Sequence, residues 1–418
     1  MRIVIVGAGV AGCILTRTLS RLPGLDVTCL ERVSAGEHSQ VGAGLNICPN
    51  GPKALRPHDA ELADAITAAS FPWRACKVSL TDGTVLLDLP LAQVADNEGW
   101  RIGWSDFYRI LRGAAAPAVS YGCTITHMAP CECDTDKTCI EWSQDGVERR
   151  LTDIDLLVAT DGRHSQVRWT ISGAPAVRHL GVAISRMLVP DTSGGLIGDH
   201  DQWFNGPNRL LGFRVPPDHV YATCTFPIPP DEPIPEALKE PEALRALYMP
   251  PSGKLSPAAA WTLDRLCANA ADLHWTRMQE HDVLYADPHW NVLYLGDAAH
   301  GMAPALAQGV AQAVEDVAVA GDIIAREWAA GCRDPRRWLR LIARARLERM
   351  RFAMQLSVEA TETMLEGADP AAGLMQKMQP GFLARLRSLY SDVAGNLTSS
   401  MDGASAGARR RPVEGLTA

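Results

Sequence analysis

The sequence predicts an α/β fold whose main sheet is parallel. Residues 2–6 form a short β-branched run, residues 11–21 have a helical pattern, and residues 26–30 form a second candidate strand. A strand–helix–strand unit of this kind is typical of a parallel sheet. Two further runs, 154–159 and 292–295, are continuously apolar, as expected for strands buried on both faces of such a sheet.

A second, antiparallel sheet is predicted between these pieces. Residues 78–89 alternate in polarity and contain an Asp-Gly hairpin signal. Residues 177–226 have the pattern of several short strands with proline-rich joints, and residues 227–251 predict a surface excursion. A long amphipathic helix is expected over residues 335–365.

The composition excludes several classes of protein. The chain has 418 residues, with 40 Lys plus Arg against 48 Asp plus Glu, so its formal net charge is −8. This length predicts two or three domains, and an acidic chain without a basic block argues against a nucleic-acid binder. No apolar run approaches the roughly 20 residues that cross a bilayer, and the N-terminus lacks a signal-peptide cleavage site. We therefore expect a cytoplasmic globular protein without a membrane partner.

The cysteines indicate neither a metal site nor a disulfide framework. The chain has 11 of them, and only Cys131, Cys133 and Cys139 cluster. Their spacing does not match a zinc site or a set of paired bridges. We expect reduced thiols and no metal.

A glycine motif joins the first strand to the first helix. Gly7, Gly9 and Gly12 form G-x-G-x-x-G, in which the glycines permit a tight turn, a close approach to pyrophosphate and close helix–strand packing. Glu31, followed by Arg32, ends the second strand, where an acid can accept hydrogen bonds from a ribose. This predicts a Rossmann-like site for FAD or NAD, because the carboxylate would repel the 2′-phosphate of NADP. The alternative is a glycine turn without a ligand.

Two further segments follow buried strands. Asp161, Gly162 and Arg168 belong to a D-G-x-x-S-x-x-R run, and Gly296 and Asp297 begin a second acid–glycine segment. An acid at the carboxyl end of a parallel strand can bind a ribityl hydroxyl, and a following helix start can direct amides at a flavin. Either run alone could be an ordinary strand-to-helix turn.

In this order, the three motifs resemble the FAD-dependent aromatic hydroxylases, the single-component flavoprotein monooxygenases typified by p-hydroxybenzoate hydroxylase. The resemblance extends over most of residues 1–330. It implies FAD as cofactor, NADH or NADPH as co-substrate, and O₂ as oxidant, with a flavin C4a-hydroperoxide that hydroxylates an aromatic ring. A second dinucleotide fingerprint is not visible, and the family lacks one too.

The resemblance also assigns residues to FAD. Gly7, Gly9, Gly12 and Glu31 would hold the ADP part of FAD, and Asp297 would hold the ribityl–pyrophosphate region. Arg168 belongs to a segment linked to NAD(P)H. The loop from Gly42 to Leu45 looks like the mobile segment beside the isoalloxazine. The backbone amides of Gly309 and Val310 would face the pyrimidine part of the flavin. The residues assigned in this way are Gly7, Gly9, Gly12, Glu31, Arg32, Gly42, Gly44, Arg101, Asp161, Gly162, Arg168, Gly296, Asp297, Pro304, Gly309 and Val310.

The sequence departs from the family's pattern at two positions. Trp104 stands where an Arg usually touches the flavin chain, so either Arg101 substitutes for it or the contact is lost. Ala311 stands where an Asn is often found. Both differences concern the local geometry of FAD binding.

The substrate side is predicted on the strand pair 208–226. Arg209 offers a bidentate clamp for a carboxylate, and Arg209 and Tyr221 stand at the spacing of substrate contacts in the pyridine-carboxylate oxygenases of this family. The alternatives are a surface arginine and a half-buried strand tyrosine. His300 is a candidate base or a packed helix-start histidine, and Pro304 is a turn over the flavin or an ordinary first-turn proline.

These observations predict interleaved domains. Residues 1–70, 96–175 and 275–330 would form a Rossmann-like FAD-binding domain, and 71–95 with 176–274 an α+β substrate domain. Residues 331–395 would be C-terminal helices, and 396–418 a disordered tail. The expected function is NAD(P)H-dependent hydroxylation of a small aromatic or pyridine carboxylate in aromatic catabolism, by a monomer or homodimer. A flavin oxidase or reductase, or a decarboxylative or ring-opening oxygenase, remains an alternative.

Overall fold

The computed structural model describes residues 1–36, 43–132, 134 and 136–393. Its six-stranded sheet has the order β18-β19-β12-β1-β2-β8. β1 pairs in parallel with β2 and β12, β12 pairs in parallel with β19, and only β18 is antiparallel. The strands are β1 (Arg2–Val6), β2 (Asp26–Leu30), β8 (Val119–Ser120), β12 (Leu156–Ala159), β18 (Ala286–Asp287) and β19 (Val292–Tyr294).

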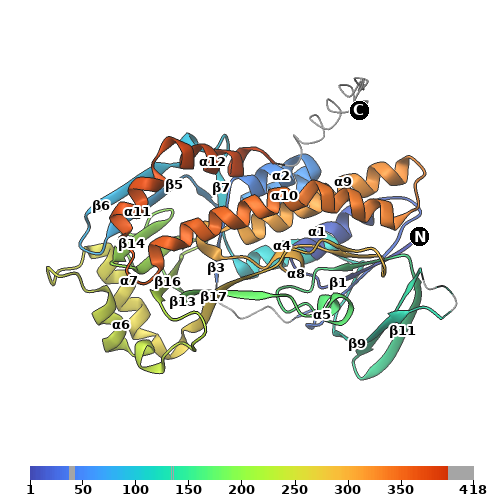
Figure 1. Cartoon of the computed structure of the whole chain (residues 1–418), viewed down its shortest axis with the longest axis horizontal. Helices are drawn as coiled ribbons and strands as arrows, with labels where there is room; N and C mark the ends of the chain where they lie inside the picture. Colours follow the sequence, from blue (N-terminus) through green and yellow to red (C-terminus); the bar gives the residue numbers. More distant parts are fainter. Residues whose placement is uncertain (37–42, 133, 135, 394–418) are drawn as a thin grey trace, which may run out of the picture.

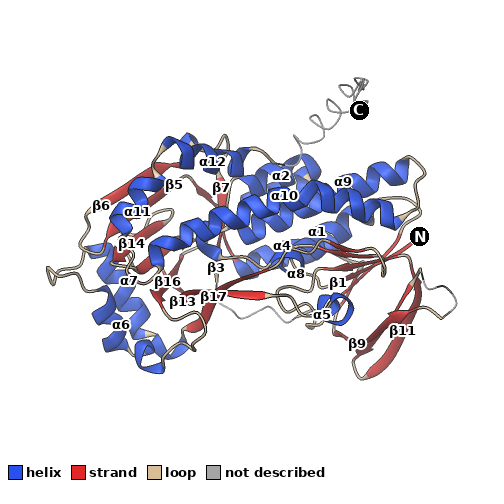
Figure 2. Cartoon of the chain, in the orientation of Figure 1, coloured by secondary structure: helices blue, strands red, loops and turns tan. Residues whose placement is uncertain are grey.

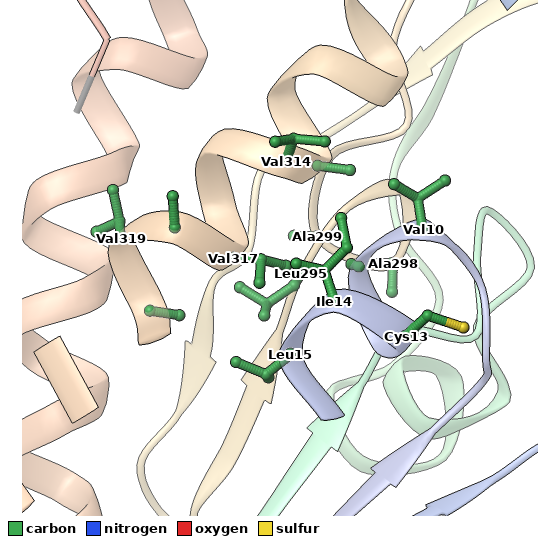
Figure 3. Packing of buried hydrophobic residues seen from close by; sticks show 14 of the residues in the cluster. Val10, Cys13, Ile14, Leu15, Leu295, Ala298, Ala299, Val314, Val317 and Val319 are labelled. Carbon is green, nitrogen blue, oxygen red and sulfur yellow. The ribbon is translucent and has the colours of Figure 1, made fainter. Parts of the chain in front are cut away.

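Helices cover this sheet, and its core is continuous with theirs. α1 (Val10–Leu19) contacts α4 (Trp104–Ala115) and α9 (Gln308–Ala329). Figure 3 shows Ile14 of α1 close to Val317 of α9 and Leu295 beyond β19, and all three side chains are buried. The expected α/β class, with a mainly parallel sheet, is confirmed. The remaining helices of this part are α2 (Asn50–His58), α3 (Ala60–Ala68), α5 (Gln166–Ser172), α8 (Asp297–His300) and the 3-10 turn η4 (Pro304–Leu306).

The second sheet has seven strands in the order β17-β13-β16-β15-β14-β5-β6. It is antiparallel, as predicted, except that β14 and β5 pair in parallel, because β5 joins the sheet from an earlier part of the chain. In Figure 2 this sheet and its helices lie to the left of the six-stranded sheet. The strands are β5 (Ala75–Leu80), β6 (Val85–Pro90), β13 (Val177–Pro190), β14 (Asp201–Asn205), β15 (Asn208–Val215), β16 (His219–Pro227) and β17 (His274–His281).

The predicted surface excursion at 227–251 is partly wrong. α6 (Pro241–Tyr248) lies within it and buries Leu244 and Tyr248, whose hydroxyl donates to the Thr225 carbonyl oxygen at 2.8 Å. The amphipathic pattern of this short helix therefore attaches it to the sheet. It packs against η2 (Glu236–Lys239) and α7 (Pro257–Ala268). The other short turns of this part are η1 (Leu91–Gln93) and η3 (Ala270–Asp272).

Two three-stranded sheets complete the strands. One contains β3, β7 and β4 (Gly44–Ile47, Gly99–Gly103, Phe71–Trp73), and the other contains β9, β10 and β11 (Cys123–Pro130, Thr138–Gln144, Val147–Ile154). In the second sheet Cys131 and Cys139 form a disulfide, with their Cα atoms 5.4 Å apart. The expectation of reduced thiols is wrong for this pair, because the hairpin brings the two cysteines together across a turn.

The C-terminal helices return to the seven-stranded sheet. α10 (Pro335–Thr361) crosses the molecule beside α9, the turn η5 (Glu362–Met364) follows, and α11 (Pro370–Lys377) and α12 (Pro380–Ser391) lie near β5 and β6 (Figure 1). The predicted long helix over 335–365 is confirmed within a few residues. The predicted tail, 396–418, lies outside the described residues. Within the described ranges, no helix has both the length and the apolar character needed to cross a bilayer.

Candidate functional site

A cavity of about 1130 Å³ lies where the two sheets meet the C-terminal helices. One part of its wall comes from the loops that follow β1, β2, β12 and β19, which all end at the same edge of the six-stranded sheet. The other part comes from the seven-stranded sheet and from α11 and α12. Such an edge, bordering a second domain, is the usual place for a ligand in an open α/β fold.

The first glycine turn is closely packed. Gly7 has φ +98°, and a Cβ there would lie 2.7 Å from the carbonyl oxygen of Thr160. A Cβ on Gly12 would lie only 1.9 Å from the carbonyl oxygen of Gly7. Gly9 precedes α1 without a side-chain cap, and the first turn of α1 has no acidic residue. The wall of the cavity here therefore consists of a helix N-terminus whose amides and positive dipole end suit a phosphate.

Glu31 closes the same turn from the end of β2. Its Oε2 accepts from the amide of Ala8 at 2.6 Å, and its Oε1 accepts from the amide of Val33 at 3.0 Å. Glu31 and Arg32 both line the cavity. The carboxylate is thus held beside the glycine turn, on the wall of the cavity.

The second motif divides into a cavity part and a structural part. Asp161 and Gly162 line the cavity, and Asp161 accepts from the Ser165 hydroxyl at 2.5 Å and from the Val167 amide at 3.1 Å. Burial raises the pKa of Asp161, and these hydrogen bonds oppose that rise. The Asp161 carboxylate therefore also fixes the start of α5.

Arg168 does not reach the cavity, contrary to its assignment. Its buried guanidinium donates to the carbonyl oxygens of Ala298, Ala299 and Asp282 and forms an ion pair with the Asp282 carboxylate at 2.9 Å. These bonds use the side chain to hold α8 against α5. Its role in the fold is to support the third motif from behind.

The third motif lies on the cavity. Gly296 has φ +60°, and its amide donates to Asp316 Oδ2 at 2.9 Å, which fixes the turn before α8. Asp297 and Pro304 line the cavity, as do Gly309 and Val310 in the first turn of α9. The acid, the proline turn and a second helix N-terminus therefore face the same space as the first motif.

Arg101 does not line the cavity, contrary to its assignment to FAD. It lies on β7, and its guanidinium donates to carbonyl oxygens of Pro72, Gly198 and Arg214 and lies 2.7 Å from a carboxylate oxygen of Asp199. These contacts hold the side chain between β4, β15 and the loop at Gly198. The side chains that line the cavity after β7 are Trp104, Tyr108 and Arg112.

Gly44 is the described part of the predicted flavin-side loop. It lines the cavity at the start of β3, and a Cβ there would lie 2.6 Å from Val215 and 2.8 Å from the Cβ of Tyr221. The absence of a side chain at Gly44 lets the loop approach the seven-stranded sheet closely. Gly42 lies outside the described residues.

His300 does not line the cavity, contrary to its assignment as a candidate base. It is fully buried, and its Nε2 lies 2.6 Å from Asp316 Oδ2. Arg346 of α10 donates to Asp316 and Glu315 at 2.7 and 2.9 Å. The histidine therefore belongs to a buried charge network behind Gly296, as its packing alternative implied, and cannot touch a ligand.

Arg209 on β15 and Tyr221 on the neighbouring strand β16 both line the cavity; Arg209 pairs with Thr225 and Tyr221 with Phe213. Arg209 is 5% exposed; its Nη1 donates to Gln202 Oε1 over a long 3.4 Å, and its Nε has no partner among the described residues. Burial lowers the pKa of Arg209 to about 10. Tyr221 stacks on Phe213 at 4.8 Å, and burial raises its pKa. A buried guanidinium without a carboxylate partner is suited to an anion from outside the protein.

His200 is a site residue that sequence reasoning missed. It lines the cavity, stacks on Trp73, and its ring nitrogens lie 2.5 Å from Asn46 Nδ2 and 3.0 Å from Gln202 Nε2. Burial lowers the pKa of His200 to about 3, so the ring is neutral at physiological pH. Through Gln202 it orients Arg209. No local motif surrounds it, so the sequence offered no signal.

Lys377 is the second such residue. It lies at the end of α11, lines the cavity, and donates from Nζ to the Ala360 carbonyl oxygen at 3.0 Å and to the Thr363 hydroxyl at 3.3 Å. Burial lowers the pKa of Lys377 to about 8, and Arg209 adds to the lowering. The part of the cavity wall formed by the seven-stranded sheet and α11 thus carries three basic side chains, from Lys377, Arg209 and Arg186. Within the described residues, no group of acids, histidines and cysteines could hold a metal ion.

Comparison with known proteins gives a consistent class. No protein-family model matches the chain. The chain is 27% identical over 346 residues to 2-heptyl-3-hydroxy-4(1H)-quinolone synthase of Pseudomonas aeruginosa. This match covers 80% of this chain and 82% of that protein. It is 29% identical over 351 residues to FAD-dependent urate hydroxylase of Klebsiella pneumoniae, with 80% and 84% covered. To 6-hydroxynicotinate 3-monooxygenase of Pseudomonas fluorescens it is 25% identical over 333 residues, with 76% and 81% covered.

The fold is shared with solved structures. The crystal structure of Klebsiella pneumoniae HpxO complexed with FAD and uric acid matches with a TM-score of 0.73 at 20% identity, over 96% of this chain and 95% of that one. This structure shows the shared fold. The relatives confirm the resemblance to the FAD-dependent aromatic hydroxylases and the expectation that the chain is an enzyme of the FAD-dependent hydroxylase and monooxygenase kind.

Proposed function

We propose that the chain binds FAD along the loops of the six-stranded sheet and hydroxylates a small aromatic or N-heteroaromatic carboxylate, with NAD(P)H and O₂ as co-substrates. The environment of Arg209 is the observation that supports a carboxylate on the substrate. It is a buried cation on the cavity wall, and no carboxylate of the described chain lies within ion-pair distance of it. An anionic ligand would supply the missing partner.

The residues of the first motif fit FAD. Side chains at Gly7 and Gly12 would fill the turn, while the amides of the α1 N-terminus remain open to a pyrophosphate. Glu31 and Arg32 of the cavity wall would bind the adenosine ribose, and Asp297 with the α9 N-terminus would bind the ribityl and pyrimidine parts. Bound FAD would supply the redox chemistry and the transfer of oxygen to the ring.

The chain's own residues would bind and orient the ring. Arg209, held by Gln202, would take the carboxylate, and Tyr221 and Phe213 would contact the ring plane. His200 is neutral and contacts two amide side chains, so it orients Gln202 and adds no charge. Pro304 and the apolar wall would exclude water from the reacting face.

One set of measurements tests this function. The purified protein should show a bound-flavin spectrum, and hydroxybenzoates or hydroxypyridine carboxylates should accelerate NAD(P)H oxidation and yield a hydroxylated product. Oxygen uptake without an oxygenated product would instead indicate a flavin oxidase, and loss of CO₂ or of ring absorbance a decarboxylative or ring-opening oxygenase. If no ring compound accelerates flavin reduction, the hydroxylase assignment fails.

A further inference from the structure

The end of the cavity near the C-terminal helices differs chemically from the rest. Leu374, Met378, Phe382 and Leu383 line it from α11 and α12. Val78 and Leu87 line it from β5 and β6, and in Figure 1 these helices lie over that end of the seven-stranded sheet, at the opposite side of the molecule from β1 and α1. We name these six residues the apolar subsite.

The apolar subsite is part of a packed structure. Leu374 and Val78 belong to one hydrophobic cluster, which also contains Phe204 of the cavity wall. The charged residue of α11 that lines the cavity is Lys377, whose ammonium already donates to Ala360 and Thr363. A water molecule against the six side chains would find few hydrogen-bond partners, so an apolar occupant is favoured there.

The position of Arg209 sets the order of groups along the cavity. Arg209 and Gln202 provide the polar end of the substrate region, on β15 and β14. The next strands in the sheet are β5 and β6, which carry Val78 and Leu87. A ring anchored by its carboxylate at Arg209 therefore has the apolar subsite beside it, across the sheet.

A thin wall separates this end from solvent. Thr363, Lys377 and Phe382 line both the cavity and a smaller surface pocket of about 490 Å³. One layer of side chains thus divides the two spaces.

We propose that the apolar subsite binds an apolar substituent of the substrate, an alkyl chain or a fused ring, and that α11 and α12 thereby select the substrate. This inference rests on the proposed function, because it places the substrate ring beside Arg209. It changes the expected substrate from a small polar carboxylate to an amphipathic one. The C-terminal helices become a specificity element, although they lie outside both sheets.

Binding to the FAD-loaded protein tests the subsite without measuring turnover. Isothermal titration calorimetry is made with 4-hydroxybenzoate and its 3-methyl, 3-propyl and 3-pentyl derivatives, and with 6-hydroxynicotinate and its 5-methyl, 5-propyl and 5-pentyl derivatives. In at least one series, Kd should fall about three- to fourfold per added methylene, the fold-change that corresponds to burying one such group.

Two variants locate the effect. Leu383→Gln should weaken binding of the pentyl compound at least tenfold and leave Kd for the unsubstituted ring within a factor of two. Met375→Gln is the matched control, because Met375 lies on α11 but is 69% exposed and does not line the cavity. Unsubstituted-ring binding and the melting temperature report whether each variant is folded.

The outcomes separate the two proposals. A Kd that is independent of chain length in both series, or an equal gain retained in Leu383→Gln, overturns the subsite, and the proposed function still stands if unsubstituted rings are hydroxylated. Chain-length-dependent binding without any oxygenated product leaves the subsite standing and overturns the proposed function. If no ring binds in either series, both proposals fail.

Discussion

Nε2 of His300 lies 2.6 Å from Oδ2 of Asp316, and both side chains are fully buried behind the cavity. The same carboxylate oxygen accepts from the amide of Gly296, and the other accepts from Arg346. A buried carboxylate with charged partners thus fixes the turn that presents Asp297. The pair supports the cofactor loop without contacting what that loop would bind.

Removing the Asp316 charge should destabilise the fold. Asp316→Asn leaves Arg346 buried without one of its partners, and breaking a buried ion pair in this way costs about 3–5 kcal/mol. The expected result is a large fall in the free energy of unfolding, measured by urea denaturation at pH 7. Asp322→Asn on the same helix is the control, since that side chain is exposed. Equal stability of both variants would show that the network contributes nothing.

Stability should also depend on pH through Asp316. Burial would raise the pKa of this carboxyl, but His300 and Arg346 outweigh burial and hold the pKa well below its usual range. A depressed carboxyl pKa stabilises the fold above the unfolded value of about 4, and that stabilisation is lost as the pH falls toward the folded value. Urea titrations from pH 6 to 2 should therefore show a loss of stability below pH 4 that is smaller in Asp316→Asn.

The glycine turn should not tolerate a methyl group. A Cβ on Gly12 would overlap a backbone carbonyl, so Gly12→Ala must displace either α1 or the turn. We expect the variant to lose more than nine-tenths of its bound FAD, measured by the flavin-to-protein absorbance ratio. Gly113→Ala in α4 is the control: nothing lies within 4 Å of its Cβ, and alanine in a helix gains up to about 1 kcal/mol. Full flavin content in Gly12→Ala would contradict the assigned turn.

Arg209 should control substrate affinity and not cofactor affinity. Arg209→Ala removes a charge-assisted contact of about 1.5–3 kcal/mol, so the KM for a carboxylate substrate should rise at least tenfold while FAD content stays unchanged. Arg214→Ala is the matched control: Arg214 lies on the same strand but is half exposed, ion-paired with Asp191 and absent from the cavity wall. An unchanged KM in Arg209→Ala would remove Arg209 from the substrate site.

Lys377 should make anion binding pH-dependent. Burial lowers its pKa to about 8, so the ammonium is charged below pH 8 and becomes neutral as the pH rises above it. The Kd of a ring carboxylate should therefore rise between pH 7 and 9 in the wild type. Lys377→Met should bind weakly at pH 7 and match the wild type at pH 9. Parallel pH profiles for the two proteins would show that Lys377 does not contact the anion.

The sequence predicted the features that depend on local chain geometry. The turn at Gly7 and Gly12 and the acid at Glu31 follow from spacing along one strand–helix–strand unit, so the motif places them together. Arg209 was reached from its place in the predicted strand pair 208–226, from the bidentate chemistry of arginine and from resemblance to a family. Arg101, Arg168 and His300 were misplaced because a motif fixes the backbone but not the face on which a side chain lies.

Other features could not be predicted because they join distant parts of the chain. Lys377 reaches the cavity that Arg209 lines only after α10 has crossed the molecule. The contact of His200 with Asn46 joins residues from two different sheets. The disulfide between Cys131 and Cys139 depends on the register of a hairpin whose strands have no strong pattern. In each case the tertiary fold, and not the local sequence, sets the contact.

The order of elements along the chain has a consequence for biosynthesis. Every strand of both sheets precedes residue 295, whereas α11 and α12 begin at residues 370 and 380. On the ribosome, both sheets can therefore form while the far side of the cavity is still missing. During that interval the side of the cavity that α11 and α12 later line is open to solvent.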